Sequence, residues 1–535
     1  MAQEPVKTPS PTTEPAQPAR PKLTGREFYK SIGSPKFIVA PMVDRSEFAW
    51  RMLTRSYMKK HAPNPLLAYS PMFHARLFKE TAGFRAQFFQ PTRAVDGETV
   101  TPFLDGNPAI DRPLFVQFCS NDPEDFIQAA HHVAPYCDAV DLNLGCPQGI
   151  ARKGNYGAFL QENWDLIYKL INKLHTELPI PVTAKFRIQE TKEKTLEYAK
   201  MILSAGASII TVHGRRREQK GHNTGVADLT YIRYLRENLP PDTVIFANGN
   251  VLNNGDIEKC LEATGADGVM SAEGNLSDPT IFSEVPPVGC EGREYWRGRN
   301  GKGGYRVDAV FRRYLDIIHR YVLRDAVPVR KPLFLPSDPV DSTQKENETK
   351  PVEVEGEEEE GPPKKKQKRQ KGKNKVKVND PSLCAMQGHL FQLLRPMVST
   401  KTHIRDALAK SANGDIAAFE NILSMVEQAV KEGLQEYEKN PEQFDSQHNR
   451  EKLEGSKATI AEYSRPWWIC QPHIRPLPDE AFAIGAMTVS KKDQRKAEQL
   501  KKESKGPAPV QVSSLSPAVA ESEIVKSQVD TLVQG

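Results

Sequence analysis

One cysteine occupies a position suited to acid catalysis. Cys146 follows the apolar run AVDLNL, and Gly145 and Pro147 on either side of it predict a turn at the end of that run. A thiol is mostly protonated at neutral pH, so it can give a proton to a substrate. The alternative role, a small buried apolar side chain, suits Cys137 and Cys260 better, because they lie in connecting or helical sequence. We therefore expect Cys146 to act as a general acid.

Other polar residues also close apolar runs. A single His or Gln at the end of a strand is as often structural as functional. A succession of polar ends in consecutive runs is hard to explain by solvation alone. The residues concerned are Pro41, Met42 and Val43; Gln117; Asn143; Lys185 with Arg187; His213 with Arg215; Asn248, Gly249 and Asn250; and Ala272, Glu273 and Gly274.

The hydrophobic pattern predicts the elements that position these residues. Short apolar runs alternate with longer amphipathic stretches, as in parallel strand and helix units. Eight such units in roughly 250 residues predict a (β/α)8 TIM barrel, whose reacting groups lie at the ends of the strands. The alternative, a doubly wound open sheet, is less favoured because no GxGxxG follows the first run. The runs are 37–42, 66–72, 114–118, 139–144, 182–187, 209–213, 244–249 and 267–272.

Two features of such a barrel indicate a phosphorylated, flavin-like cofactor. Gly249 and Gly274 follow the last two runs, where backbone N–H groups of a TIM barrel commonly bind a phosphate. They can also be ordinary turn glycines. Lys185, among apolar neighbours at the end of the fifth run, would place a cation beside a ring that becomes anionic on reduction. The alternative for Lys185 is a surface lysine with a buried stem.

These residues resemble the successive motifs of tRNA-dihydrouridine synthases. The resemblance covers about residues 35–285 strongly and MQGHLFQLLRP more weakly, and NLGCP followed by RKGNYGA is its most specific part. The chain resembles most the eukaryotic subfamily that acts at positions 16 and 17 of the tRNA D loop. The matching segments are APMVDRSEFAWR, DLNLGCPQGIARKGNYGAFL, KFRI, TVHGRRREQKG, ANGN and MSAEGNLSDPTIF.

The resemblance implies an FMN enzyme that reduces the C5=C6 bond of uridine in tRNA, with NADPH or NADH as reductant. Hydride goes to C6, and Cys146 corresponds to the acid that protonates C5. Asn143 corresponds to the residue that holds the uracil, and we assign Arg152, Lys153 and Arg215 to substrate binding as well. The implied cofactor residues are Pro41, Met42, Val43, Gln117, Lys185, His213, Asn248, Gly249, Asn250, Ala272 and Glu273.

One position departs from the family pattern. Many members carry Gly-Arg-Gly after the eighth strand, where the arginine helps to bind the FMN phosphate. This chain has Ala272, Glu273 and Gly274 there, and a glutamate cannot neutralise a phosphate. We therefore expect backbone amides to make that contact.

Composition divides the chain into ordered and solvated parts. The mean hydropathy of −0.55 is low for one packed globule, which indicates long polar segments. A charged segment contains an acidic run followed by a basic tract at 364–377, which either binds RNA or directs nuclear import. The predicted parts are a disordered tail (1–30), an FMN-binding barrel (31–285), a helical tRNA-binding domain (286–335 and 383–475), a charged disordered insertion (336–382) and a flexible C-terminal tail (476–535).

Two features of the helical domain bear on RNA binding. Six basic residues cluster in its first part and are candidates for phosphate contacts. Trp467, Trp468 and Cys470 either stack on bases or, as we favour, lock the C-terminal segment onto the domain. The basic residues are Arg312, Arg313, Arg320, Arg324, Arg330 and Lys331.

Several classes of protein are disfavoured by composition. Seven cysteines without a CxxC pair argue against a disulfide framework or a zinc site. The first residues lack the apolar stretch of a signal peptide, and no run of about 18 apolar residues occurs. We expect a soluble monomer of the cytoplasm, the nucleus or both, without membrane contact.

Two alternative functions remain open at this level. An FMN barrel oxidoreductase acting on a free pyrimidine would share the barrel and cofactor but would not need the basic helical domain. A tRNA-binding protein without turnover would share the domain, although the presence of Cys146, Lys185 and His213 argues against lost activity. The choice of uridine, and of NADPH or NADH, is not visible in any motif.

Overall fold

The computed structural model describes most of the chain between residues 22 and 474. The described ranges are 22–59, 64–95, 99–220, 225–339, 379–445, 463 and 465–474. The start of the predicted N-terminal tail, the basic tract 364–377 and the predicted C-terminal tail lie outside them. None of the described helices is both long and apolar enough to cross a membrane.

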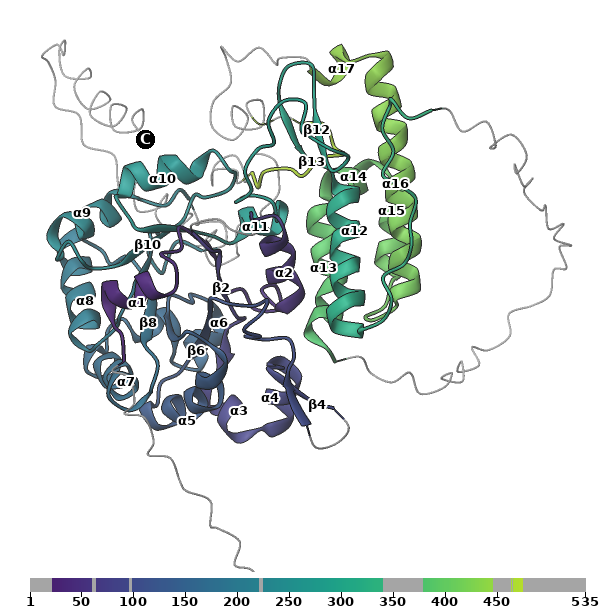
Figure 1. The fold of residues 1–535 in the computed structure, drawn as a ribbon. Coiled ribbons are helices and arrows are strands. Elements are labelled where there is room, and N and C mark those ends of the chain that lie inside the picture. Colours follow the sequence, from purple (N-terminus) through teal and green to yellow (C-terminus); the bar gives the residue numbers. More distant parts are fainter. Residues whose placement is uncertain are drawn as a thin grey trace, which may run out of the picture. The chain divides into compact units, whose positions relative to one another are not determined.

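Parallel strands form a closed barrel, as the apolar runs predict (Figure 1). The pairs β1–β11 and β2–β6 complete the circle, which excludes the open-sheet alternative. All the predicted runs are confirmed as strands. They are β1 (Phe37–Val39), β2 (Leu67–Tyr69), β6 (Leu114–Cys119), β7 (Ala139–Leu144), β8 (Val182–Arg187), β9 (Ile210–His213), β10 (Ile245–Asn248) and β11 (Gly268–Ser271).

Successive residues of each strand face opposite sides of the barrel wall, because side chains alternate along a strand. On β7, Val140, Leu142 and Leu144 belong to the apolar layer between the strands and the outer helices. Ala139 belongs to the separate interior cluster, and Asp141 and Asn143 share its side of the strand. The interior is thus apolar at the start of the strand and polar towards its end.

Helices cover the outside of the barrel, and their ends follow local sequence. Asp122 caps α5 by accepting a hydrogen bond from the Asp125 N–H at 2.8 Å, and Pro123 begins the helix. Asn163 caps α7 in the same way. The covering helices are α2 (Phe48–Ser56), α3 (Ala75–Glu80), α5 (Pro123–Val133), α7 (Trp164–Glu177), α8 (Lys192–Ser204), α9 (Thr230–Asn238), α10 (Asp256–Thr264) and α11 (Glu273–Ser277).

Short elements extend the connections between strands. Between β2 and β6 the chain forms β3 (Phe73–His74), α4 (Ala82–Phe88) and the antiparallel pair β4 (Thr92–Val95) and β5 (Thr99–Pro102). After β7 it forms α6 (Gly149–Lys153) and the 3-10 turn η2 (Gly157–Leu160). A further 3-10 turn, η1 (Ala134–Tyr136), follows α5.

An N-terminal helix, α1 (Gly25–Ser31), closes the interior of the barrel at the starts of the strands. Phe28 stacks on Phe115 with ring centroids 5.9 Å apart, and the Tyr29 hydroxyl lies 3.1 Å from the carbonyl oxygen of Asp267. The prediction of disorder up to residue 30 is therefore wrong for the last part of that range. Two aromatic side chains suffice to anchor this short segment. The mean composition of residues 1–30 is polar in spite of them, and it therefore predicted disorder.

A helical region follows the barrel, as predicted, and its described residues form one compact unit with those of the barrel (Figure 1). Unpredicted features are the hairpin of β12 (Tyr295–Arg297) and β13 (Gly303–Tyr305) and a π-helical turn, η4 (Ile318–Leu323). The helices are α12 (Val307–Ile317), α13 (Pro381–Leu393), α14 (Arg395–Thr400), α15 (Thr402–Lys410), α16 (Ile416–Lys439) and α17 (Glu442–Asp445).

The segment that contains Trp467, Trp468 and Cys470 packs against the helical region. Trp468 is fully buried, and its ring lies against those of Trp296, Tyr437 and Phe444 at centroid distances of 5.5, 6.2 and 5.0 Å. The structural role expected for Trp468 and Cys470 is confirmed, because both side chains are buried and neither can stack on an RNA base.

The ends of the charged insertion are ordered, contrary to the predicted limits of 336 and 382. Asp338 forms an ion pair with Arg293 at 2.6 Å. At the other end, Asp380 accepts hydrogen bonds from the N–H groups of Ser382 and Leu383 and so caps α13, which begins at Pro381. A capping aspartate followed by proline is a local helix-start signal that charge composition obscures.

The packing of α1 predicts a large loss of stability in Phe28→Ala. Removing a buried phenyl ring costs about 3–5 kcal/mol of unfolding free energy. The measurement is chemical denaturation of the full chain. Leu23→Ala, at a position 43% exposed just before the same helix, is the control and is expected to change stability by less than about 0.5 kcal/mol. Equal effects of the two changes would show that α1 is not part of the barrel fold.

Candidate active site

The strand register brings the predicted polar residues together at the mouth of the barrel. Asn143 on β7 pairs with Lys185 on β8, and Arg187 pairs with His213 on β9. His213 in turn pairs with Asn248 on β10. Residues far apart in the chain therefore form two short rows, which are adjacent on β8, where Lys185 and Arg187 are two residues apart.

A chain of hydrogen bonds links the barrel interior to the loop that carries Cys146. Gln117 Nε2 donates to Asp141 Oδ2 at 2.8 Å, and Asn143 Nδ2 donates to Gln117 Oε1 at 2.8 Å. The N–H groups of Gly145 and Cys146 donate to Asn143 Oδ1 at 3.1 and 2.9 Å. Two predicted site residues, Gln117 and Asn143, thus hold the loop of the predicted acid.

The turn around Cys146 is also fixed from the other side. Arg187 Nε donates to the Gly145 carbonyl at 2.8 Å, and Lys220 Nζ donates to the Pro147 carbonyl at 2.6 Å. The Cys146 carbonyl accepts a hydrogen bond from the Ala158 N–H at 3.1 Å. The backbone around the thiol is therefore held by several independent hydrogen bonds, while the Cys146 side chain stays partly exposed.

Gly157 explains part of the motif that follows Cys146. Its φ is +64°, and a Cβ there would lie 2.9 Å from both the Cβ and the carbonyl oxygen of Cys146. Only glycine adopts this conformation and allows this approach without strain. Gly157, the second glycine of GNYGA, is thus required for the shape of the Cys146 turn.

Cys119 is a second thiol in the same small cluster. It ends β6 and packs with Ala151, Tyr156 and Cys146, but it is buried. Burial raises the pKa of Cys119 to about 12, and the nearby Cys146 adds to the increase. The geometry favours Cys146, the more accessible of the two, as the group that meets a ligand.

Two ionisable groups inside the barrel are perturbed by burial. Burial lowers the pKa of Lys185 to about 8; repulsion from Arg187 contributes, and Asp141 opposes the shift. Burial raises the pKa of Asp141 to about 6, against the hydrogen bonds from Thr183 and Gln117. A half-buried lysine whose pKa is lowered in this way is typical of a functional site rather than of the surface.

A cavity of about 310 Å³ opens beside the Cys146 turn. Several predicted cofactor residues line it, as do three cationic side chains that can meet an anion. The cations are Arg187, Arg215 and Lys220. The predicted cofactor residues in its wall are His213, Asn248, Gly249, Asn250, Ala272 and Glu273.

Asn250 and Arg215 shape one wall of this cavity. Arg215 donates to His213 Nε2 at 3.0 Å, to Asn250 Oδ1 at 2.9 Å and to the Gly225 carbonyl. Gly249 has φ of +120°, and a Cβ there would approach Ala227 Cβ to 2.6 Å. Arg215, which we predicted to bind substrate, therefore lies with the predicted cofactor residues.

The remaining predicted residues lie around this centre. Glu273 begins the short helix α11 and lies 3.5 Å from His473 Nε2. Pro41, Met42 and Val43 follow β1, where the Met42 N–H donates to Ser46 Oγ at 3.0 Å.

Arg152 and Lys153 are exposed on α6, outside the walls of the 310 Å³ cavity. This placement leaves both side chains accessible to a macromolecular substrate.

Sequence reasoning missed Lys220 and gave Arg187 no role. Arg187 was visible at a strand end, but its contact with Gly145 depends on the tertiary fold. Lys220 lies in HGRRREQKG, where several cations stand close together and nothing in the pattern singles out the one that reaches the Cys146 turn.

Helix α13 braces the loop after β1. His389 lies 3.1 Å from both carboxylate oxygens of Glu47 and stacks on Trp50, with ring centroids 3.9 Å apart. Trp50 Nε1 donates to Asn275 Oδ1 on α11 at 2.9 Å. The loop that carries Met42 and the helix that begins at Glu273 are thus tied to the helical region.

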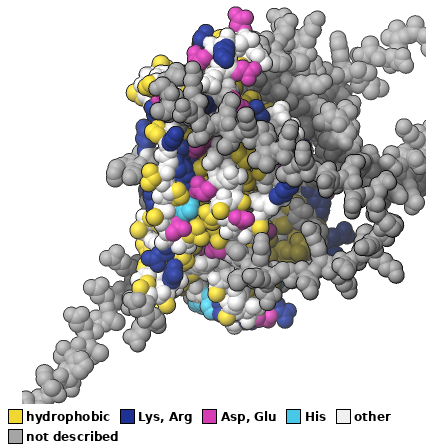
Figure 2. Space-filling model, turned by 90° about the vertical axis from the view of Figure 1, so that its right-hand side faces the viewer, with side chains coloured by type: hydrophobic (Ala, Val, Ile, Leu, Met, Phe, Trp, Pro, Cys, Tyr) yellow, Lys and Arg dark blue, Asp and Glu magenta, His cyan; other side chains and the backbone are white. Residues whose placement is uncertain are grey.

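The basic cluster of the helical region is only partly available for a ligand. Arg312 pairs with Glu427 at 2.6 Å, Arg330 with Glu420 at 2.7 Å, and Arg313 with Glu294. On the face drawn in Figure 2, basic and acidic side chains are interspersed. Of the six predicted contacts, Arg320, Arg324 and Lys331 are exposed.

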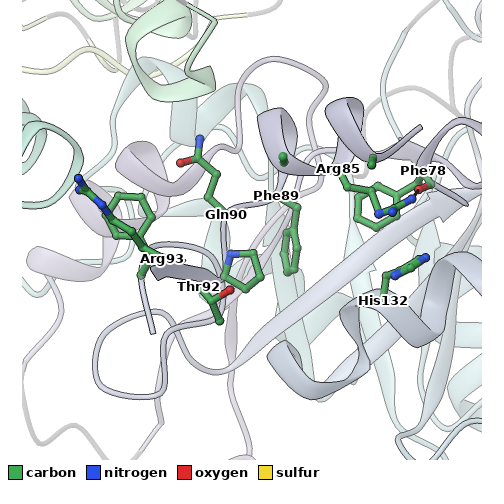
Figure 3. Close-up of a pocket in the computed structure, with 11 residues that line it drawn as sticks. Phe78, Arg85, Phe89, Gln90, Thr92, Arg93 and His132 are labelled. Carbon is green, nitrogen blue, oxygen red and sulfur yellow. Dashed lines mark hydrogen bonds between the residues drawn. The ribbon is translucent and has the colours of Figure 1, made fainter. Parts of the chain in front are cut away.

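A second cavity, of about 620 Å³, is lined by residues of α3, α4, β4 and α5 and of the neighbouring connections (Figure 3). Arg85 there donates to the carbonyl oxygens of Phe78 and Lys79, each at 2.7 Å, so it joins α3 to α4. None of the predicted site residues lines this cavity. The reactive groups therefore gather at the barrel mouth.

Comparison with known proteins identifies the family of this chain. The sequence pattern of the family described as "Dihydrouridine synthase (Dus)" matches residues 38–294. A tRNA-dihydrouridine(16/17) synthase of Schizosaccharomyces pombe is 43% identical over 86% of this chain and 92% of its own length. The chain belongs to the dihydrouridine synthase family. A protein of the same name from Saccharomyces cerevisiae is 40% identical over 89% of this chain and 93% of its own length.

The brace at α13 of this dihydrouridine synthase predicts that His389→Ala is strongly destabilising. It would leave the buried carboxylate of Glu47 without its partner, at a cost of about 1–3 kcal/mol or more, and would remove the ring stacked on Trp50. Thermal and chemical denaturation measure the effect. His403→Ala, at an exposed position on α15, is the control. Equal stability of the two variants would contradict a bracing role.

Burial of Lys185 predicts a stability effect that depends on pH. The folded protein releases the proton at about pH 8, whereas an unfolded lysine keeps it to about 10.5. The penalty for burying the cation is therefore complete below pH 8 and disappears as pH rises towards 10.5. Lys185→Met should stabilise the cofactor-free protein at pH 7, and the gain should shrink by pH 10. Denaturation of Lys185→Met and of the exposed control Lys200→Met at both pH values checks this, and a gain that grows with pH would contradict it.

Proposed function

We propose that this protein is a tRNA-dihydrouridine synthase that uses FMN and NADPH or NADH to reduce uridines at positions 16 and 17 of the tRNA D loop. The observation that carries the proposal is the Cys146 thiol, held by Asn143 at the mouth of the barrel next to a cavity with cationic walls. The S. pombe and S. cerevisiae relatives bear names that give these positions and NAD(P)(+).

The residues present fit a phosphorylated flavin. Gly249 and Asn250, both with positive φ, form a turn in the cavity wall, and the same wall presents the cations Arg187, Arg215 and Lys220. Lys185 lies two residues before Arg187 on β8, and Arg187 pairs with His213 on β9. The phosphate end would lie at Gly249 and Asn250, and the ring near Lys185 and Gln117. Glu273 offers its backbone rather than a cation.

When bound, the flavin supplies the hydride for uracil C6. The protein supplies the proton, which the Cys146 thiol gives to C5. The Asn143 amide orients the base, because its remaining N–H can donate to a uracil carbonyl oxygen. Lys185 stabilises the negative charge that develops in a site with little water. The bonds that fix the Cys146 turn keep the thiol at the distance that proton transfer needs.

A uracil in folded tRNA must leave its stack to reach the barrel mouth. Extruding a base costs a few kcal/mol, which contacts to the RNA backbone offset. Exposed cations on two elements are suited to those contacts: Arg152 and Lys153 on α6, and Arg320 and Arg324 in the helical region. We propose the helical region, with the predicted boundaries corrected at α13, as the tRNA-binding domain.

Cys146→Ala tests the proposal. The variant should keep FMN and bind tRNA but form dihydrouridine about 10²–10⁴ times more slowly, as is typical when a positioned acid is removed. Mass spectrometry of the nucleosides of treated tRNA measures the product. Cys119→Ala, which changes the neighbouring buried thiol, should stay close to the wild-type rate.

Three outcomes would contradict the proposed function. Normal turnover in Cys146→Ala together with loss of turnover in Cys119→Ala would show that Cys119, and not Cys146, is the acid. Wild-type reduction of free uridine at the rate found for tRNA would favour a free-pyrimidine oxidoreductase. A purified wild-type protein without the visible absorption of a flavin would favour a tRNA-binding protein without turnover.

A further inference from the structure

Asp141 is a buried carboxyl group under the predicted site, on the interior face of β7. Its oxygens accept hydrogen bonds from Thr183 Oγ1 at 2.6 Å and Gln117 Nε2 at 2.8 Å. Both contacts run between neighbouring strands, because the register pairs Asp141 with Gln117 on β6 and with Thr183 on β8. Among the described residues no ion pair to Asp141 is found within contact distance, so these two hydrogen bonds are its direct contacts, and the nearby Lys185 cation adds a favourable electrostatic interaction.

The hydrogen-bond chain that starts at Asp141 can run in one direction only. An ionised carboxylate only accepts, so Gln117 must turn its NH2 group towards Asp141 and its oxygen towards Asn143. At the other end, the backbone N–H groups of Gly145 and Cys146 only donate, so Asn143 must turn its oxygen towards them. Both amides are therefore fixed in orientation from both ends.

We propose that Asp141 is a positioning residue: it orients Gln117 and Asn143 and, through Asn143, holds the turn that presents the Cys146 thiol. The inference rests on the proposed function for its kinetic consequence. Its structural consequence does not depend on that function, because the chain ends on backbone atoms of the Cys146 turn.

The orientation also determines what Asn143 can offer to a substrate. Its oxygen accepts two backbone hydrogen bonds, and one N–H is committed to Gln117. An amide oxygen has two lone pairs, so the group left for a ligand is the second N–H. Asn143 therefore meets an acceptor on the base, such as a carbonyl oxygen, and not the N3–H group of a uracil.

Substitution of Asp141 separates positioning from simple loss of packing. Asp141→Leu fills similar space but cannot accept from Gln117, so the Gln117 amide loses its interior partner and both amides are held only from the Cys146 turn. Asp141→Asn should restore function, because its oxygen can accept from Gln117 while its NH2 group donates to the Thr183 hydroxyl. Thr211→Val is the matched control, since Thr211 is equally buried on β9 but outside the chain.

The experiment uses the full chain loaded with FMN, reduced with NADPH and mixed with saturating tRNA. Flavin reoxidation gives the rate, and mass spectrometry after brief iodoacetamide treatment gives the alkylation rate of Cys146. In Asp141→Leu the reoxidation rate should fall about 10- to 100-fold, as expected for a misplaced reacting group, with flavin content unchanged. Cys146 alkylation should rise severalfold. Thr211→Val should match the wild type in both measurements. Asp141→Asn should match the wild type in Cys146 alkylation and recover most of the reoxidation rate, since it restores the hydrogen bond but removes a charge that favours the Lys185 cation.

The outcomes distinguish this inference from the proposed function. If tRNA does not reoxidise the wild-type flavin, the proposed function fails, and the alkylation rates alone decide the role of Asp141. Wild-type values in Asp141→Leu, or an equal loss in Thr211→Val, would overturn the inference.

Should Asp141→Leu fail to fold, Asp141→Ser, which is too short to reach Gln117, takes its place with the same expected losses. Loss of flavin from both variants with unchanged alkylation would also overturn it, in favour of a cofactor-binding role.

Discussion

The register of the closed parallel sheet is the constraint on which the rest of the structure depends. Because side chains alternate along a strand, a slip of one residue on β7 would turn Asp141 and Asn143 out of the barrel and Leu142 and Leu144 into it. The outer helices prevent that slip, since they bury Leu142 and Leu144 in the apolar layer. Hydrophobic packing on one side of the wall thereby fixes the polar chemistry on the other.

Polar groups in the interior are costly, and the structure limits the cost by bonding them to each other. Gln117, Asn143 and Asp141 form a continuous chain that ends on the backbone of the Cys146 turn. Lys185 is a different case, because burial holds its pKa well below the ordinary lysine value. A site that must stabilise developing negative charge keeps such a cation at the expense of stability.

The helical region has a structural role in addition to any contact with RNA. His389 on α13 binds Glu47 and stacks on Trp50, and Trp50 is bonded to Asn275 on α11. The loop after β1 and the helix after β11 are therefore stabilised by residues that come more than a hundred positions later in the chain. A site built in this way depends on the correct docking of the helices.

The sequence by itself determined the strands, the row of polar strand ends and the Cys146 turn, because these follow from local patterns: apolar runs of strand length, and Gly and Pro around one cysteine. It did not determine that Phe28 and Tyr29 close the barrel, that Arg312 and Arg330 pair with glutamates of α16, or that Arg215 lies with the predicted cofactor residues. These are contacts between segments distant in the chain, and charge or composition within one segment carries no information about the partner. The direction of the hydrogen bonds that start at Asp141 was also not visible in the sequence. Only the register of β6, β7 and β8 sets Asp141 between Gln117 and Thr183.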